Sequence, residues 1–276
     1  MTEQYRLLLS RSMMFAFVAA FAIVLATASG ILADTIVDHP DKLKFEELKY
    51  QPPKPDGYRH ALKCGATAYV VENPTIPTVD LTILAHTGSM YEPVEKAGLA
   101  GITGYLMRNG GVQGMTTKQL DERLAFLAGE ISVDVGDSRG RASLFCLSKD
   151  VDEGLGLLKK VLQSPVFDPE ALNRYRGDIL SDMKQRNASA SAIESREWDF
   201  LIYGDHPCTT PQRRTEQSVN SITREDMIAF QQKHFFPKNF IIAVSGDFKT
   251  TDILAKLDKM FVGWPNHELT RIDFPI

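Results

Sequence analysis

The order of strand-like and helix-like segments is the feature that most constrains the fold of this chain. Short apolar or alternating runs predict strands, and longer runs with apolar residues three and four apart predict helices. The order is a strand pair, a helix pair, a second strand pair, several helices, one strand and a last helix, which differs from the strict alternation of a doubly wound fold. We therefore expect an α+β domain with an antiparallel or mixed sheet and helices packed on one face. The strands are expected at 59–72, 79–85, 130–135, 139–147 and 240–244, and the helices at 96–109, 116–128, 151–162, 168–187, 191–203, 223–235 and 251–261.

Local signals refine this arrangement at turns and helix starts. The proline-containing segment 73–77 separates the first two strands, and we expect those strands to form an antiparallel hairpin. Helix N-termini favour side chains that accept hydrogen bonds from the unpaired N–H groups of the first turn. The residues expected in that role are Thr116, Asp168 and Ser191.

The N-terminus has the pattern of a secretory signal. Arg6 and Arg11 precede an apolar run over 13–28, and small residues follow it. We expect a signal peptide at 1–28, cleaved after Ala28, and an extended proline-containing leader at 29–57. The apolar run is shorter than the ~20 residues that a membrane span usually needs, so no stable span is expected. The protein is then periplasmic or secreted, and it is membrane-anchored if the segment stays uncleaved.

Charge and cysteine content exclude other classes. The net charge is −4, from 31 basic and 35 acidic residues spread evenly along the chain. Such a chain offers no broad basic field for a nucleic acid, so we expect no nucleic-acid partner. Three cysteines are too few and too odd in number for a disulfide framework. We expect them to be three buried small hydrophobic residues, with one bridge and one free thiol as the alternative.

Three sequence segments resemble the pitrilysin/insulinase family of zinc metallopeptidases. The segment GSMYEP at 88–93, followed by GLA at 98–100, is similar to the entry to the active-site helix of that family, and 116–127 is similar to its next helix. FFPKN at 235–239, running into VSGDF at 244–248, resembles a family strand motif. The similarity covers 58–264, so the resemblance implies the N-terminal half of the family's two-domain clamshell. Residues 265–276 are then a tail or a truncated interdomain linker.

The resemblance also locates the family's zinc site on this sequence. Active members carry H-x-x-E-H after G-L-A, with two histidines that bind zinc and a glutamate that activates the metal-bound water. A later helix supplies a zinc-binding glutamate and, before it, a supporting glutamate. The two histidines correspond to Gly101 and Tyr105 in this sequence, and the general base between them corresponds to Gly104. The supporting glutamate corresponds to Tyr175, and the zinc-binding glutamate corresponds to Asp182. We call these the mapped positions.

The mapped positions lack the side chains that the inherited chemistry needs. A catalytic zinc requires about three protein ligands and an open position for water. Glycine offers no donor atom, a phenol has a pKa of about 10, and no base remains at Gly104. The resemblance therefore implies an inactive homologue with no catalytic residue, no bound metal and no cofactor, whereas its active relatives use zinc.

Helical spacing separates two faces of this segment. Leu99, Ile102 and Leu106 share one face and should pack on the core, whereas Gly101, Gly104 and Tyr105 should share the opposite face. The glycines either mark drift after ligand loss or permit close approach of a backbone or a ligand.

These observations predict an exported, catalytically inactive homologue. The resemblance implies that it pairs with a catalytic pitrilysin-type subunit or a second half-domain and helps to enclose extended peptides. A first alternative is a stand-alone periplasmic module that binds peptides or proteins. A second is an active metalloendopeptidase with relocated zinc ligands, such as His86 and Asp182.

Overall fold

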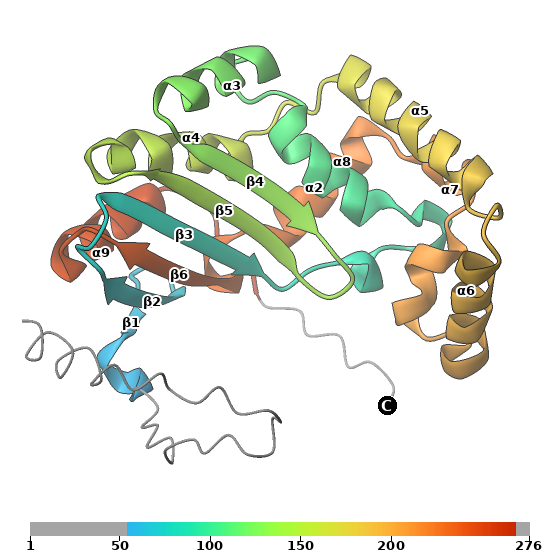
Figure 1. Cartoon of the computed structure of the whole chain (residues 1–276), viewed down its shortest axis with the longest axis horizontal. Helices are drawn as coiled ribbons and strands as arrows, with labels where there is room; N and C mark the ends of the chain where they lie inside the picture. Colours follow the sequence, from blue (N-terminus) through green and yellow to red (C-terminus); the bar gives the residue numbers. More distant parts are fainter. Residues whose placement is uncertain (1–53, 269–276) are drawn as a thin grey trace, which may run out of the picture. The chain divides into compact units, whose positions relative to one another are not determined.

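The computed structural model describes residues 54–268 and contains one mixed sheet of six strands in the order β1-β2-β6-β3-β5-β4 (Figure 1). Strands β2 and β6 pair in parallel, and every other neighbouring pair is antiparallel. The expected mixed sheet is therefore confirmed. The strands are β1 (Arg59–Ala61), β2 (Thr67–Glu72), β3 (Thr78–Ala85), β4 (Glu130–Val135), β5 (Gly140–Leu147) and β6 (Phe240–Gly246).

Among residues 54–268, helices cover one face of the sheet and none lies on the other (Figure 1). In β3, Val79 and every second residue after it are buried, whereas Asp80 on the opposite face is exposed. The helices on the covered face and around it are α2 (Leu99–Asn109), α3 (Thr117–Phe126), α4 (Val151–Gln163), α5 (Pro169–Gln185), α6 (Ala190–Tyr203), α7 (Glu216–Ser221), α8 (Arg224–His234) and α9 (Thr250–Met260).

The predicted hairpin between the first two strands is wrong. β6 lies between β2 and β3, because Val244 is the parallel partner of Val70 and the antiparallel partner of Leu81. The side chains of β6 on the covered face are buried, so its insertion in the sheet interior removes apolar surface that a local hairpin would leave exposed. The predicted strand 59–72 instead divides into β1 and β2 around Gly65, whose φ of 91° permits the reversal.

Two of the three predicted helix starts are confirmed. Thr116 and Gln119 form a reciprocal capping box at α3, and Asp168 accepts the backbone N–H of Glu170 at α5. The prediction for Ser191 is wrong by two residues. Ser189 has an extended backbone and accepts the N–H of Ala192, so α6 has already begun at Ala190.

Most of the expected processing segments lie outside the described residues. These are the signal peptide at 1–28, most of the leader at 29–57 and most of the tail at 265–276. The domain limits 58–264 stay a prediction. Within residues 54–268, no helix is both long enough and apolar enough to cross a membrane.

Candidate functional site

The entry to α2 is built on a buried carboxylate. Glu92 is only 7% exposed, and its two carboxylate oxygens accept the backbone N–H groups of Gly98 at 2.8 Å and Ala100 at 2.6 Å. Burial raises the pKa of Glu92 to about 7, against the opposing effect of these hydrogen bonds and of Arg214. Gly98 is the N-terminal capping residue of α2 and has a φ of 107°, a conformation that favours glycine.

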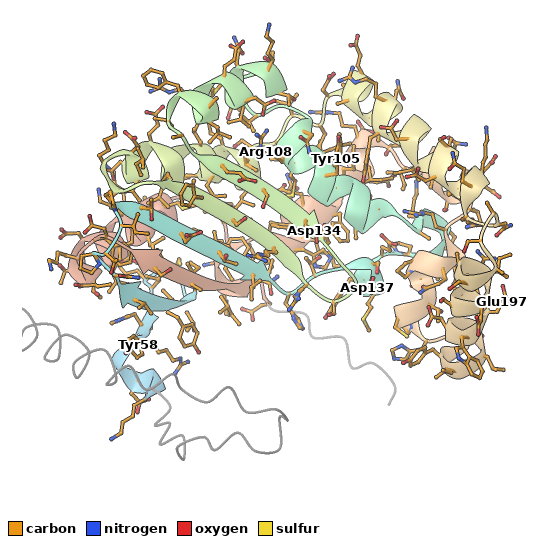
Figure 2. All side chains as sticks on the ribbon, in the orientation of Figure 1. Tyr58, Tyr105, Arg108, Asp134, Asp137 and Glu197 are labelled. Carbon is orange, nitrogen blue, oxygen red and sulfur yellow. The ribbon has the colours of Figure 1, made fainter. Side chains whose placement is uncertain are left out.

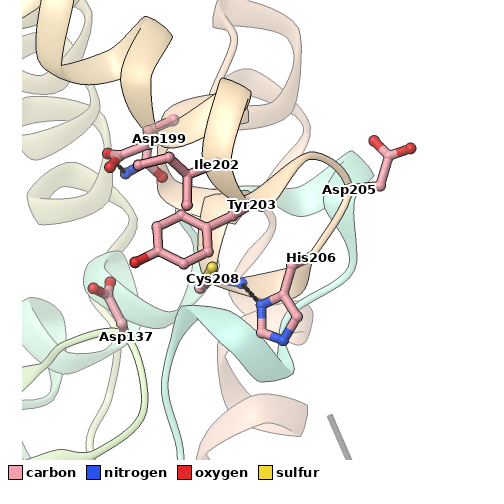
Figure 3. A pocket seen from close by; sticks show the side chains of 8 residues that line it. Asp137, Asp199, Ile202, Tyr203, Asp205, His206 and Cys208 are labelled. Carbon is pink, nitrogen blue, oxygen red and sulfur yellow. Dashed lines mark hydrogen bonds between the residues drawn. The ribbon is translucent and has the colours of Figure 1, made fainter. Parts of the chain in front are cut away.

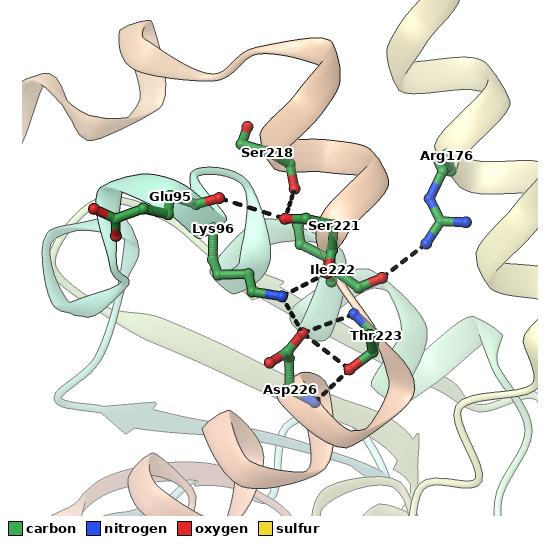
Figure 4. A network of polar contacts seen from close by, with 8 residues as sticks. All are labelled: Glu95, Lys96, Arg176, Ser218, Ser221, Ile222, Thr223 and Asp226. Carbon is green, nitrogen blue, oxygen red and sulfur yellow. Dashed lines mark hydrogen bonds and ion pairs between the residues drawn. The ribbon is translucent and has the colours of Figure 1, made fainter.

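A polar network fixes the same entry segment to α7 and α8 (Figure 4). The ammonium group of Lys96 donates to the carbonyl oxygen of Ser221 and contacts the Asp226 carboxylate at 2.7 Å. Arg176, on α5, donates to the carbonyl oxygen of Ile222 at 2.8 Å. Both segments that carry mapped positions are therefore tied to one short stretch of chain between α7 and α8.

The core-facing side of α2 agrees with its predicted pattern. Leu99, Ile102 and Leu106 are all buried, as their spacing predicts. Gly104 is buried as well, so the expectation that it shares an open face with Gly101 is wrong. A Cβ atom at Gly104 would lie 2.7 Å from the Cγ2 atom of Val135 and 3.0 Å from its backbone nitrogen. The missing side chain therefore allows α2 to approach β4 closely.

Gly101 lies in a different environment from Gly104. It is exposed, and a Cβ atom there would meet no atom within 4 Å. The close-approach explanation thus applies to Gly104, where the neighbour is a strand, and nothing in the fold requires glycine at Gly101.

Two other mapped positions hold tyrosines that stack on one another. The rings of Tyr105, on α2, and Tyr175, on α5, have centroids 3.7 Å apart and planes 10° apart. Burial raises the pKa of the Tyr175 phenol, and the neighbouring Tyr105 raises it further. The Tyr175 phenol is therefore neutral at ordinary pH, and a neutral phenol is a poor metal ligand. Figure 2 shows Tyr105 on α2 beside β4, which carries Asp134.

Two of the five mapped residues line a small cavity. A cavity of about 150 Å³ is lined by Gly101 and Tyr175 together with Glu92, Asp137 and Arg214. This volume is below the 300–1,000 Å³ typical of small-molecule pockets. Asp182, the only mapped carboxylate, is exposed on α5 and is not among the lining residues.

These residues do not fit a catalytic zinc ion. Two mapped positions have no side chain, two hold stacked phenols, and the one carboxylate lies away from the cavity lining. Across residues 54–268, no group of three or more His, Cys, Asp or Glu side chains is arranged to hold a metal ion. His86 packs edge-on against Tyr91 at 5.8 Å between ring centroids.

Sequence reasoning missed the polar residues of the cavity. Glu92 lies within the segment that carries the family resemblance, but a lone acidic residue before a helix does not show whether it will be buried. Arg214 follows Arg213, and such a pair usually lies on a solvated surface. Only the tertiary structure places Arg214 over Gly98 and beside the cavity.

Comparison with known proteins identifies similar sequences over most of the chain. Residues 67–200 match the family described as Insulinase (Peptidase family M16), and residues 221–276 match the description Peptidase M16 inactive domain. An uncharacterized zinc protease of Rickettsia felis is 22% identical over 200 residues, which are 72% of this chain and 48% of that protein. The non-peptidase homolog YmxG of Helicobacter pylori is 21% identical over 187 residues, which are 68% of this chain and 43% of that protein.

A solved structure has a similar fold. The peptidase M16 inactive domain from Pseudomonas fluorescens superimposes with a TM-score of 0.73 at 23% identity, over 78% of this chain and 52% of that one. The chain spans about half the length of the proteins that it matches.

Proposed function

Because this chain is a homologue of the pitrilysin/insulinase (M16) peptidase family, we propose that it is an exported, catalytically inactive member. In this proposal it pairs with an active family subunit and forms part of the wall around an extended peptide. Pairing with such a subunit, or with a second half-domain, is proposed because this chain matches about one half of the solved structure that it resembles. Export is favoured by the signal-like pattern at 1–28.

The observation that carries the inactive assignment is the contact between Gly104 and Val135. A general base at position 104 needs a side chain, and even a Cβ atom there would lie 2.7 Å from the Val135 side chain. Real Cβ contacts essentially never come so close, so α2 would have to move away from β4 to accommodate a glutamate. In this proposal the site has no general base, and the packing at Gly104 opposes the return of one.

Peptide binding is proposed at the free edge of β4. This strand ends the sheet order, and an edge strand can accept an extended peptide through main-chain hydrogen bonds. The edge is partly capped already, because Arg108 donates from Nε to the carbonyl oxygen of Ile131 at 2.9 Å. The peptide would therefore pair along the part of β4 that follows Ile131, beside the mapped positions.

Zinc stoichiometry tests the inactive assignment directly. The mature chain is dialysed against metal-free buffer and then against buffer with trace zinc, and its metal content is measured by elemental mass spectrometry. We expect well below one zinc ion per chain, and no cleavage of a peptide library with or without added zinc. One tightly bound zinc per chain together with metal-dependent cleavage would contradict the proposal and favour relocated ligands.

Co-purification from native extract tests the pairing. A tagged chain should recover a protein that contains H-x-x-E-H in near-equal amount. Recovery of the tagged chain alone, with saturable peptide binding by that isolated chain, would instead favour a stand-alone peptide-binding module.

A further inference from the structure

Helix α6 has no buried residue, although it contains several large apolar side chains. It is 14 residues long, and its packing within the described part of the chain is chiefly against the short 3-10 segment η6 (Pro207–Arg213). Isolated helices of this length are marginal in water, and most helical stability in proteins comes from packing of an apolar face. A helix with this composition is therefore expected to pack against something further.

The exposed apolar residues of α6 gather at its C-terminal end. Trp198, Leu201, Ile202 and Tyr203 are 56%, 72%, 61% and 52% exposed. We call these four residues the α6 patch. Their exposed areas add up to roughly 500 Å², against the ~800 Å² that each partner buries in a standard interface. Helical spacing puts Trp198, Leu201 and Ile202 on one side of α6, and Tyr203 lies further round the helix. The patch is thus large enough to form the centre of a protein interface.

The charges around the α6 patch restrict what can cover it. Residues 190–205 carry four carboxylates and one arginine, and Arg213 of η6 pairs with Asp205, so the net charge of this surface is −2 (four negative, two positive). The arginine, Arg196, already lies 3.6 Å from Glu197. Two copies of this chain that met through their α6 patches would bring like charges together, which disfavours a homodimer. A complementary surface has an apolar centre and a rim of lysine and arginine.

The α6 patch also adjoins the candidate site. A groove of about 920 Å³ runs between α6 and the turn that joins β4 to β5, and its lining includes Ile202, Tyr203 and Asp137 (Figure 3). Asp137 and the C-terminal part of η6 also line the 150 Å³ cavity that contains Gly101. A protein docked on the patch would therefore stand beside the mapped positions and the β4 edge.

We propose that the α6 patch is the docking surface for the active pitrilysin-type subunit, which meets it with an apolar surface rimmed by lysine and arginine. This inference rests on the proposed function, because it takes the partner to be that subunit. It adds which face of the chain makes the contact, and it places the contact beside the peptide edge, where a partner wall would close the groove.

Site-specific photo-crosslinking tests the surface. A benzophenone amino acid replaces Leu201 in one variant and Phe126, which is 76% exposed on α3, in a matched control. Both variants are expressed at full length in the native host, irradiated and analysed by mass spectrometry. We expect position 201 to crosslink to an H-x-x-E-H protein at least about tenfold more than position 126 does.

Other adducts overturn the assignment in distinguishable ways. A crosslink from position 201 to residues 1–53 of the same chain would show that its own leader covers the patch. A crosslink to a second copy would show a homodimer. Crosslinking of the H-x-x-E-H protein from position 126 only would place the interface elsewhere and leave the proposed function intact. If no H-x-x-E-H protein is recovered with any variant, the proposed function itself fails.

Introducing charge on the same surface gives an independent readout. The double variant Leu201→Glu/Ile202→Glu should reduce recovery of the H-x-x-E-H protein at least about tenfold, because it places two charges at the interface centre. Phe126→Glu should change recovery less than about twofold. All three residues are exposed, so the melting temperatures of the variants should match the parent. Unchanged recovery with the double variant would overturn the proposal.

Discussion

Helices α2 and α6 are of similar length but relate to the rest of the chain in opposite ways. α2 buries seven of its 11 residues and lies against β4, whereas none of the 14 residues of α6 is buried. At the positions that the resemblance assigns to chemistry, α2 has glycine and tyrosine, yet its core-facing side is apolar apart from Thr103. α6 has no such assigned positions and exposes the four large apolar side chains of the α6 patch. The apolar residues of α2 are explained by their burial in the core of the chain. Those of α6 are exposed, and we therefore attribute them to an interface with another protein.

A matched pair of leucine substitutions should produce the largest difference between the two helices. Leu106→Ala removes a fully buried side chain and should lower the free energy of unfolding by about 2–5 kcal/mol. Leu201→Ala, at a site that is 72% exposed, should change it by less than about 0.5 kcal/mol. Urea denaturation of each purified variant measures both values. A comparable loss for Leu201→Ala would mean that α6 is packed within the isolated chain.

Two glycine-to-alanine substitutions within α2 should have effects of opposite sign. Gly104→Ala places a Cβ atom against Val135 and should destabilise the chain by about 1–3 kcal/mol through overpacking. Gly101→Ala meets open space and should stabilise the helix by up to ~1 kcal/mol, because glycine is a poor helix former. Thermal melts of the two variants beside the parent measure this difference. Equal effects would show that α2 does not approach β4 as described.

Two buried ionisable groups near α2, Glu92 and His234, should have opposite effects on how the free energy of unfolding depends on pH. Burial raises the pKa of Glu92 to about 7 from 4.5, so the folded chain holds a proton that the unfolded chain releases, and stability falls as pH rises through this window. Burial lowers the pKa of His234, at the end of α8, to about 4 from 6.5, so stability rises with pH there. Between pH 4.5 and 6.5 the two slopes oppose each other.

Replacing one of the two groups should make the pH dependence that is due to the other group measurable. Glu92→Gln leaves the His234 effect, so the free energy of unfolding should rise by up to about 1.4 kcal/mol per pH unit between pH 4.5 and 6.5. His234→Leu should give a slope of similar size and opposite sign. Urea titrations at several pH values measure both slopes, and the double variant is the control. Parallel pH profiles for the parent and both single variants would contradict the burial of these groups.

The fluorescence of the two tryptophans reports directly on the difference in solvent exposure between α6 and the core, and it is the smallest effect that we predict. Trp198 is 56% exposed on α6, whereas Trp264 is 9% exposed in the core. In a Trp264→Phe variant, acrylamide should quench the remaining fluorescence several-fold more strongly than it does in a Trp198→Phe variant. Addition of the paired subunit should protect Trp198 selectively. Weak quenching of Trp198 in the isolated chain would mean that another part of the chain already covers the α6 patch.

Short-range signals predicted much of the fold correctly. The capping box at Thr116, the start of α5 at Asp168 and the buried face of α2 all depend on residues within one or two helical turns. The hairpin prediction failed because β6 comes from a segment far along the chain and pairs with both β2 and β3. Local pattern does not carry such long-range pairing.

The candidate site shows the same division. The chemical identity of the mapped residues is written in the sequence, and it alone predicts that a zinc-based mechanism lacks its ligands and its base. The contact of Gly104 with Val135 could not be predicted, because it depends on how closely a helix lies to a strand. The stacking of Tyr105 on Tyr175 joins two helices that are separated by the second strand pair.

The sequence by itself predicted most of the element order, the helix caps at Thr116 and Asp168 and the core-facing side of α2, because each depends on residue type and local spacing. Only the tertiary structure decided the central place of β6, the burial of Glu92, the closeness of α2 to β4 and the exposure of the α6 patch. Each of these is set by packing between segments distant in the chain. Which distant segments pack together depends on how much apolar surface the whole domain buries, and a local sequence pattern does not predict that.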